Sequence, residues 1–210
     1  SYAELDGFKA YLSLKDINGS QIAPTNFNVI VYPLSQSWNE GFGQDIYSFN
    51  DLDRSNWMTA SYTDGAEVLW NQQGARAEGL LRSADIDVIG SGSIAGGDTQ
   101  FLYSTQYFEK GHEDLYVDIT TQLSATMAGY LPDVGYLVDF SGSEETDSKS
   151  RFVKRFGSRH TRDPYLRPAI IVAYNDHQKD GRDNIIFNTT GSIFLENKNY
   201  GIYACLLYTS

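Results

Sequence analysis

Several residue types and motifs that carry chemistry or covalent stability are rare or missing in this chain. The 210 residues include a single cysteine, Cys205, which excludes an intrachain disulfide and a cysteine-based metal cluster and leaves the redox compartment open. None of the three histidines stands four residues from another, which excludes the usual helical zinc motif. The sequence has no Gly-Lys dipeptide, which excludes a phosphate-binding P-loop. It also has no Gly-x-Ser-x-Gly segment, which excludes the nucleophile elbow of hydrolases.

Positive charge and long apolar runs are also scarce. Sixteen basic residues face 27 acidic ones, for a net charge of −11, which disfavours binding to nucleic acid or to an anionic membrane. No apolar run approaches the roughly 20 residues of a membrane-spanning helix. What the chain has instead is 14% aromatic residues, 19 glycines and 15 tyrosines. This composition is typical of strands joined by tight turns.

The hydrophobic periodicity predicts a chain made almost entirely of strands. Apolar residues recur with a period of two or as short apolar runs in residues 8–14, 27–34, 101–108, 114–119, 135–140, 151–156 and 168–174. We expect 27–34 to be central in its sheet, and 168–174, which is apolar on both faces, to lie deep in a sheet. Residues 35–83 are expected to form long ordered loops with short strands, and 89–98 (IGSGSIAGGD) a turn or bulge.

A single helix is expected. It begins near Asp118, runs for about three turns, and ends at Gly129 and Pro132, since acidic and hydroxyl residues start helices and glycine or proline ends them. The sequence therefore predicts an all-β fold, an antiparallel jelly-roll β-sandwich with one short helix. The alternative is an immunoglobulin-like sandwich, which the missing Cys…Trp…Cys framework disfavours.

The predicted domain organisation has four parts. Residues 1–175 form the sandwich, the polar stretch 176–184 is a linker, and 185–203 start a following β-domain that the chain truncates. Residues 204–210 (ACLLYTS) resemble translated adapter sequence, and we expect them to be a non-native tail. On this interpretation the chain is a piece of a longer protein.

Candidate catalytic and metal-binding groups are few, and each also has a structural explanation. His112, His160 and His177 are the only imidazoles, and the adjacent acids Glu113-Asp114 and Glu144-Glu145 would point to opposite faces of a strand. Glu40 is better placed in an ordered loop, but a carboxylate that accepts loop N–H bonds explains it equally well. Residues 51–56 and 176–184 carry enough oxygen ligands for calcium, although such residues more often cap turns.

Basic residues are concentrated in one stretch near the end of the predicted sandwich. Residues 149–167 hold seven of the 16 basic residues and one acid, Asp163. Such a stretch could bind a phosphate backbone. Its alternation with Phe152 and Phe156 favours instead a strand whose outward face packs against an acidic neighbour in an assembly.

The three tryptophans are the candidate ligand-binding residues. Trp38, Trp57 and Trp70 lie among Asp, Asn and Arg in the long loops, and flat aromatic faces beside polar groups are suited to holding sugars. The alternative, that the three indoles anchor the loops to the sandwich, is favoured.

The order of several short motifs resembles a known family. These motifs are Ser37-Trp38-Asn39-Glu40-Gly41-Phe42-Gly43, Ser55-Asn56-Trp57, Trp70, Asp118-Ile119-Thr120, Gly135-Tyr136, Arg151-Phe152, Phe156-Gly157-Ser158-Arg159 and Arg167-Pro168-Ala169-Ile170. Together they make residues 11–174 similar to the DNRLRE-type domain, which is grouped with the family-96 carbohydrate-binding modules. The sequence RFVKRFGSRH…RPAIIVAYND is similar to the form of this domain found in bacteriophage particle proteins.

The resemblance implies a jelly-roll module without catalytic activity. We expect a structural or adhesion module of a phage virion protein, in the tail or head, with other virion proteins or surface glycans as partners and a place in an oligomeric assembly. The alternative is a carbohydrate-binding module of a secreted or cell-surface bacterial protein, hence extracellular; a hydrolase is a more remote third class. No cofactor is expected apart from a possible calcium ion. Ligand positions are not uniform across the family, so the motifs assign no ligand residue.

Overall fold

The computed structural model describes residues 7–17, 24–41, 53–142, 153–175, 187–188, 198–199 and 202–203. Within them the chain is mostly β-sheet with a single short α-helix. The strands are β1 (Lys9–Leu14), β2 (Phe27–Pro33), β3 (Thr59–Thr63), β4 (Ala66–Leu69), β5 (Glu78–Leu80), β6 (Val88–Ser93), β7 (Thr99–Phe101), β8 (Ser104–Phe108), β9 (Leu115–Asp118), β10 (Tyr136–Phe140), β11 (Ala169–Ala173), β12 (Lys198–Asn199) and β13 (Ile202–Tyr203). The helix α1 spans Thr120–Met127, and a 3-10 turn spans Pro164–Leu166.

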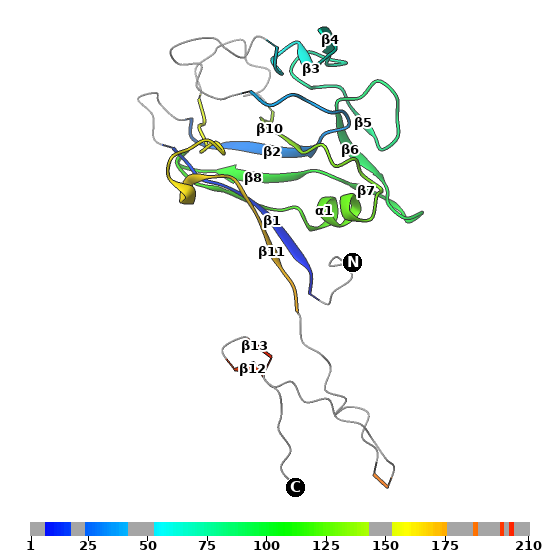
Figure 1. Cartoon of the computed structure of the whole chain (residues 1–210), viewed down its shortest axis with the longest axis vertical. Helices are drawn as coiled ribbons and strands as arrows, with labels where there is room; N and C mark the ends of the chain where they lie inside the picture. Colours follow the sequence, from blue (N-terminus) through cyan, green and yellow to red (C-terminus); the bar gives the residue numbers. More distant parts are fainter. Residues whose placement is uncertain are drawn as a thin grey trace.

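Two three-stranded antiparallel sheets enclose the main core. One has the order β11-β1-β9 and the other β10-β2-β8. In Figure 1, β2 and β8 run side by side across the molecule, while β1 and β11 run obliquely to them. Alternate residues of β1, β2 and β9 turn inward and pack together with Phe108, and the rings of Phe27 and Phe108 stack with centroids 5.0 Å apart. The predicted all-β class is therefore confirmed, whereas the jelly-roll topology remains a prediction.

A third sheet and a hairpin extend this sandwich. The order β5-β6-β7 combines a parallel pair, β5 with β6, and an antiparallel pair, β6 with β7. The prediction of a turn or bulge at 89–98 is confirmed as a bulge in its first half, because the pairing of β5 with β6 shifts register at Gly90. No turn forms there, since Val88, Ile89 and Gly90 are buried in the central strand of this sheet. The hairpin pairs β3 with β4 through the turn Asp64-Gly65, in which both residues have positive φ. Asp-Gly suits such a turn because both residues tolerate that backbone conformation.

The predicted helix is confirmed but shorter than expected. It holds eight residues, and its N-cap is Ile119, which makes no side-chain cap bond. The side chain of Asp118 accepts a hydrogen bond from the Thr120 N–H at 2.8 Å. Gly129, with φ of 78°, ends the helix as expected.

Two strand predictions near the C-terminal side of the sandwich are wrong. Of the stretch predicted as a strand at 151–156, the described part forms only an isolated bridge between Phe156 and Asp16. The strand β11 exists, but within the described residues it is an edge strand whose five residues are all exposed, not a strand deep in a sheet. An apolar sequence indicated burial on both faces, yet in the described residues the second sheet does not cover β11.

Two further expectations fall mostly outside the described residues. The predicted linker 176–184 lies outside them, as does the proposed tail 204–210. In the predicted following domain, β12 and β13 pair with each other in antiparallel fashion. No helix among the described residues is both long and apolar enough to cross a membrane.

Candidate binding cavity

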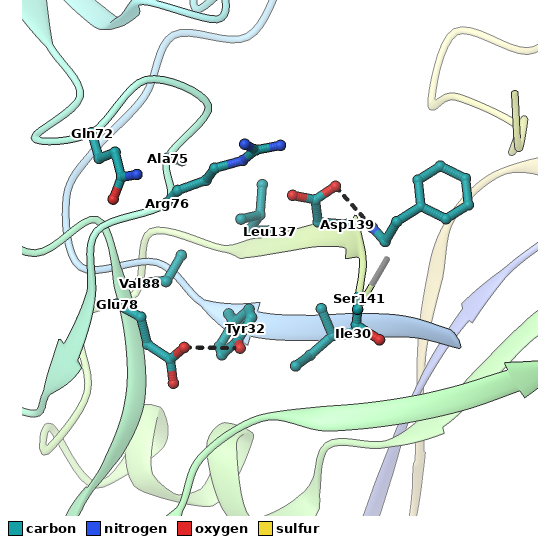
Figure 2. Close-up of a pocket in the computed structure, with 12 residues that line it drawn as sticks. Ile30, Tyr32, Gln72, Ala75, Arg76, Glu78, Val88, Leu137, Asp139 and Ser141 are labelled. Atoms are coloured by element: carbon teal, nitrogen blue, oxygen red, sulfur yellow. Dashed lines mark hydrogen bonds between the residues drawn. The ribbon is translucent and has the colours of Figure 1, made fainter. Parts of the chain in front are cut away.

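An open cavity of about 370 Å³ lies on the outer face of the β10-β2-β8 sheet. Its floor is apolar because alternate residues of β2 and β10, whose neighbours fill the core, point outward here: Ile30, Tyr32 and Leu137. Polar groups surround this floor, and Figure 2 shows them as sticks. They are the hydroxyl of Tyr32 and the side chains of Gln72, Arg76, Glu78, Asp139 and Ser141. The volume lies within the range of small-ligand sites, and an apolar floor with a few polar groups is their usual composition.

Opposite charges line two sides of the cavity. Arg76 comes from the loop before β5, and Asp139 comes from the outer face of β10. In Figure 2 the guanidinium and the carboxylate extend toward each other. An arginine presents several N–H donors, and an ionised carboxylate presents only acceptors. A ligand in this cavity therefore meets donors from one side and acceptors from the other.

A second carboxylate is fixed at the other end of the cavity by a tyrosine. The hydroxyl of Tyr32 donates a hydrogen bond to Oε2 of Glu78 at 3.1 Å. Burial, and next the charge of Glu78, raise the pKa of the Tyr32 hydroxyl, so it remains a donor at neutral pH. A Cβ on Gly90 would lie 2.0 Å from Oε1 of Glu78. Glycine at position 90 is thus what allows the Glu78 side chain to lie along β6.

The loop that carries Arg76 is organised by a buried aspartate. Asp87 is fully buried, and its carboxylate accepts hydrogen bonds from the backbone N–H groups of Asn71, Gln72 and Ala77 at 2.8 to 3.1 Å. The side-chain amides of Gln36 and Asn71 donate to the same carboxylate. A charged acceptor shared by several loop N–H groups fixes the loop much as a side-chain cap fixes a helix end. The position of Arg76 follows from this network.

Trp57 lies against the same loop. The guanidinium carbon of Arg76 is 4.8 Å from the centroid of the Trp57 ring, a cation–π distance. A Cβ on Gly74, whose φ is +80°, would lie 2.6 Å from that ring. Trp57 nevertheless keeps 55% of its surface exposed. The structure therefore brings one of the three candidate tryptophans next to a residue of the cavity.

The other two tryptophans hold loops in place. The indole N–H of Trp38 donates to the carbonyl of Val134 at 2.8 Å, and that of Trp70 donates to the carbonyl of Asn56 at 2.9 Å. Trp70 also packs, partly buried, against the small cluster of Leu34, Ala75 and Val88. Trp38 is 40% exposed. None of the three tryptophans is among the residues that line the cavity.

The remaining acidic candidates make contacts within the chain. The carboxylate of Glu40 forms an ion pair with Arg159 at 2.5 Å and lies 3.8 Å from Nε2 of His160. Glu113 accepts the backbone N–H groups of Glu109 and Lys110, and these hydrogen bonds, chiefly that from Lys110, lower its pKa. The pair Glu144-Glu145 lies outside the described residues.

Neither expected calcium loop acquires a visible ligand set in the described residues. Residues 176–184 and 51–52 lie outside them. In the rest of the first loop, the side-chain oxygen of Asn56 accepts hydrogen bonds from the backbone N–H groups of Met58 and Thr59. These hydrogen bonds cap a turn. Where the structure describes the chain, no three His, Cys, Asp or Glu side chains come together as metal ligands.

The basic stretch is used partly inside the chain. Lys154, with 3% of its side chain exposed, binds the carboxylate of Asp16 and the carbonyls of Gly111 and Glu113. Its ammonium group also lies 5.0 Å from the ring centroids of Phe108 and Phe156. His112, a further candidate, faces the same Asp16 at 3.7 Å. The chain itself thus supplies the acidic partners of Lys154 and Arg159, which corrects the interpretation of these two residues as contacts to a neighbour.

Comparisons with protein-family models, with curated proteins and with solved structures gave no match to this chain. The cavity therefore has to be judged by its own chemistry. Sequence reasoning had missed its residues, although the alternation in 27–34 and 135–140 places Tyr32 and Asp139 on one face. Nothing in the sequence indicated that Arg76 and Glu78, in the long loop region, would meet them.

Proposed function

We propose that this chain is a non-catalytic adhesion module that binds a carbohydrate in the cavity between Arg76 and Asp139. The observation that carries the proposal is the combination of a guanidinium and two carboxylates around one open cavity. The half-exposed indole of Trp57 does not line the cavity but lies against the same guanidinium. Sugars present vicinal hydroxyls and apolar C–H faces. The hydroxyls bind carboxylate acceptors and guanidinium donors, and the C–H faces pack on an aromatic ring.

The setting we propose is a bacteriophage particle. It follows from the resemblance of residues 11–174 to the form of the DNRLRE-type domain found in such particles. There the module serves structure or adhesion in the tail or head, with surface glycans or other virion proteins as partners. The same cavity chemistry also suits the alternative, an extracellular carbohydrate-binding module of a bacterial protein. The neighbouring genes separate the two settings, since portal or tail genes support the first and polysaccharide hydrolases the second.

The direct test is a glycan array with the wild type and two matched variants. We expect selected oligosaccharides to bind the wild type, Asp139→Asn to lose at least about tenfold in affinity because a charged acceptor becomes an amide, and the exposed Asp98→Asn to bind normally. Incubation with the bound oligosaccharide is expected to release no shorter product. Binding that survives Asp139→Asn, or an array with no positive glycan, contradicts the proposal.

A further inference from the structure

The strand β11 presents an open sheet edge. In the described residues it pairs only with β1, and Ile170, Ile171 and Val172 are 47%, 43% and 42% exposed. The opposite edge of the same sheet, β9, is closed by the side-chain amide of Gln106, which donates to the Asp114 carbonyl and accepts from the Tyr116 N–H. β11 contains neither charge nor proline, the residues that usually protect an edge from another strand.

The residues that precede β11 are basic. In 153–167 five basic residues face one acid, whereas 7–17, 24–41 and 53–142 together hold fifteen acids and six basic residues. Lys154 is buried and Arg159 binds Glu40. Arg162 and Arg167 are exposed, and Arg167 lies two residues before the strand. A partner complementary to this edge is therefore apolar in its centre and acidic at its end.

The hairpin of β3 and β4 carries a surface of this kind, apolar along the strand and acidic at one end. β4 pairs only with β3 among the described residues, and its four residues are all exposed. Val68 and Leu69 are 38% and 54% exposed, and the strand and its turn contain two acids, Asp64 and Glu67. In Figure 1 the β3-β4 hairpin lies at the top of the molecule, while β11 runs toward the opposite end.

We propose that the β4 edge of one copy docks on the β11 edge of a second copy, with Glu67 and Asp64 facing Arg167 and Arg162. The two surfaces differ and lie at opposite ends, so the contact is head-to-tail, and repeating it builds a ring or a filament. Added strand pairing satisfies the backbone groups of both edges, and the opposite charges fix the direction. The contact does not depend on what binds in the cavity.

Sedimentation velocity of the full chain over a range of concentrations tests the contact through a charge exchange. The wild type is expected to self-associate. Arg167→Glu and Glu67→Arg are each expected to weaken association at least about fivefold, and the double exchange to restore it to within about twofold. Arg82→Glu, an exposed arginine elsewhere, serves as the control and is expected to associate like the wild type. Melting temperatures show whether each variant is folded.

Three results overturn the proposal. One is a monomer at every concentration, and another is a double exchange that fails to restore association. The third is an assembly insensitive to Glu67→Arg but abolished by Ile171→Lys, which means that β11 pairs with itself. Glycan binding by Arg167→Glu separates this inference from the proposed function, because a normal glycan titration together with lost association leaves the cavity proposal intact.

Discussion

Replacing Asp87 by asparagine is expected to destabilise the protein far more than the loss of one surface charge. The two carboxylate oxygens receive five donors, and Oδ2 alone receives the N–H groups of Gln72 and Ala77. An asparagine amide has one oxygen, so the donors on the other side then face an NH₂ group. A buried donor left unsatisfied costs about 1–3 kcal/mol, which gives a loss of about 2–6 kcal/mol for the pair.

Urea unfolding followed by tryptophan fluorescence measures this loss, because Trp57 and Trp70 contact the loop that Asp87 holds. A domain of this size is typically stable by about 5–15 kcal/mol, so we expect a clear shift of the midpoint. In thermal unfolding, about 3 kcal/mol corresponds to a melting temperature lower by about 6–12 °C.

The matched control is Asp85→Asn, which makes the same change two residues away on an exposed side chain. Its expected cost is within about 0.5 kcal/mol of zero. Should Asp87→Asn cost no more than this control, the aspartate does not organise the loop, and the argument for how Arg76 is positioned fails.

Three further predictions concern the packing around the sandwich. Lys154→Met leaves Asp16 without its buried partner and is expected to cost about 3–5 kcal/mol in urea unfolding. Gly157→Ala is expected to be strongly destabilising in thermal unfolding, because its Cβ would lie 1.8 Å from the carbonyl oxygen of Leu166. Hydrogen bonds, first that from a lysine side chain, lower the pKa of Asp114. Its stabilisation is thus complete above the ordinary pKa of 3.8 and is lost as the pH falls below it, and Asp114→Asn is expected to reduce this acid dependence of the unfolding free energy.

Each of these predictions has a control on an exposed site. Arg162→Ala removes a basic residue outside the core, and Gly97→Ala adds a Cβ whose nearest neighbour, the Ile94 carbonyl oxygen, is 3.4 Å away. Asp98→Asn removes an exposed carboxylate. Equal effects of a substitution and its control contradict the corresponding structural explanation.

The strand whose core residues could be read from sequence is the one with a clear alternation. In residues 8–14 the alternation indicates which side chains enter the core, and the structure confirms Ala10 and Leu12 as buried. Residues 27–34 were predicted to be central, and β2 is the middle strand of its sheet, with Val29, Ile30 and Val31 all buried. An apolar run on both faces carries no such information. β11 is apolar throughout and exposed, because burial depends on whether another sheet or another chain covers the strand.

The cavity could be predicted only in part, for a related reason. Its floor follows from the strands, but Arg76 and Glu78 reach it through a loop whose course is set by Asp87. That aspartate is 10 to 16 residues distant in sequence from the N–H groups it accepts. Contacts of this kind have no local period, so pattern reasoning cannot find them. The ion pair of Lys154 with Asp16 could not be predicted for the same reason, because the two residues are 138 positions apart in the sequence.

The most direct test of the account is a calorimetric titration of an array-selected oligosaccharide into the wild type and Arg76→Gln. Glutamine keeps donor groups but removes the charge and the fork of the guanidinium. We expect an affinity at least about tenfold weaker, because hydrogen bonds to a charged group contribute about 1.5–3 kcal/mol. Loss of the cation–π contact with Trp57 is expected to lower the melting temperature by only about 1–4 °C, so the variant remains folded. Equal affinity of the two proteins would contradict the claim that this cavity is the binding site.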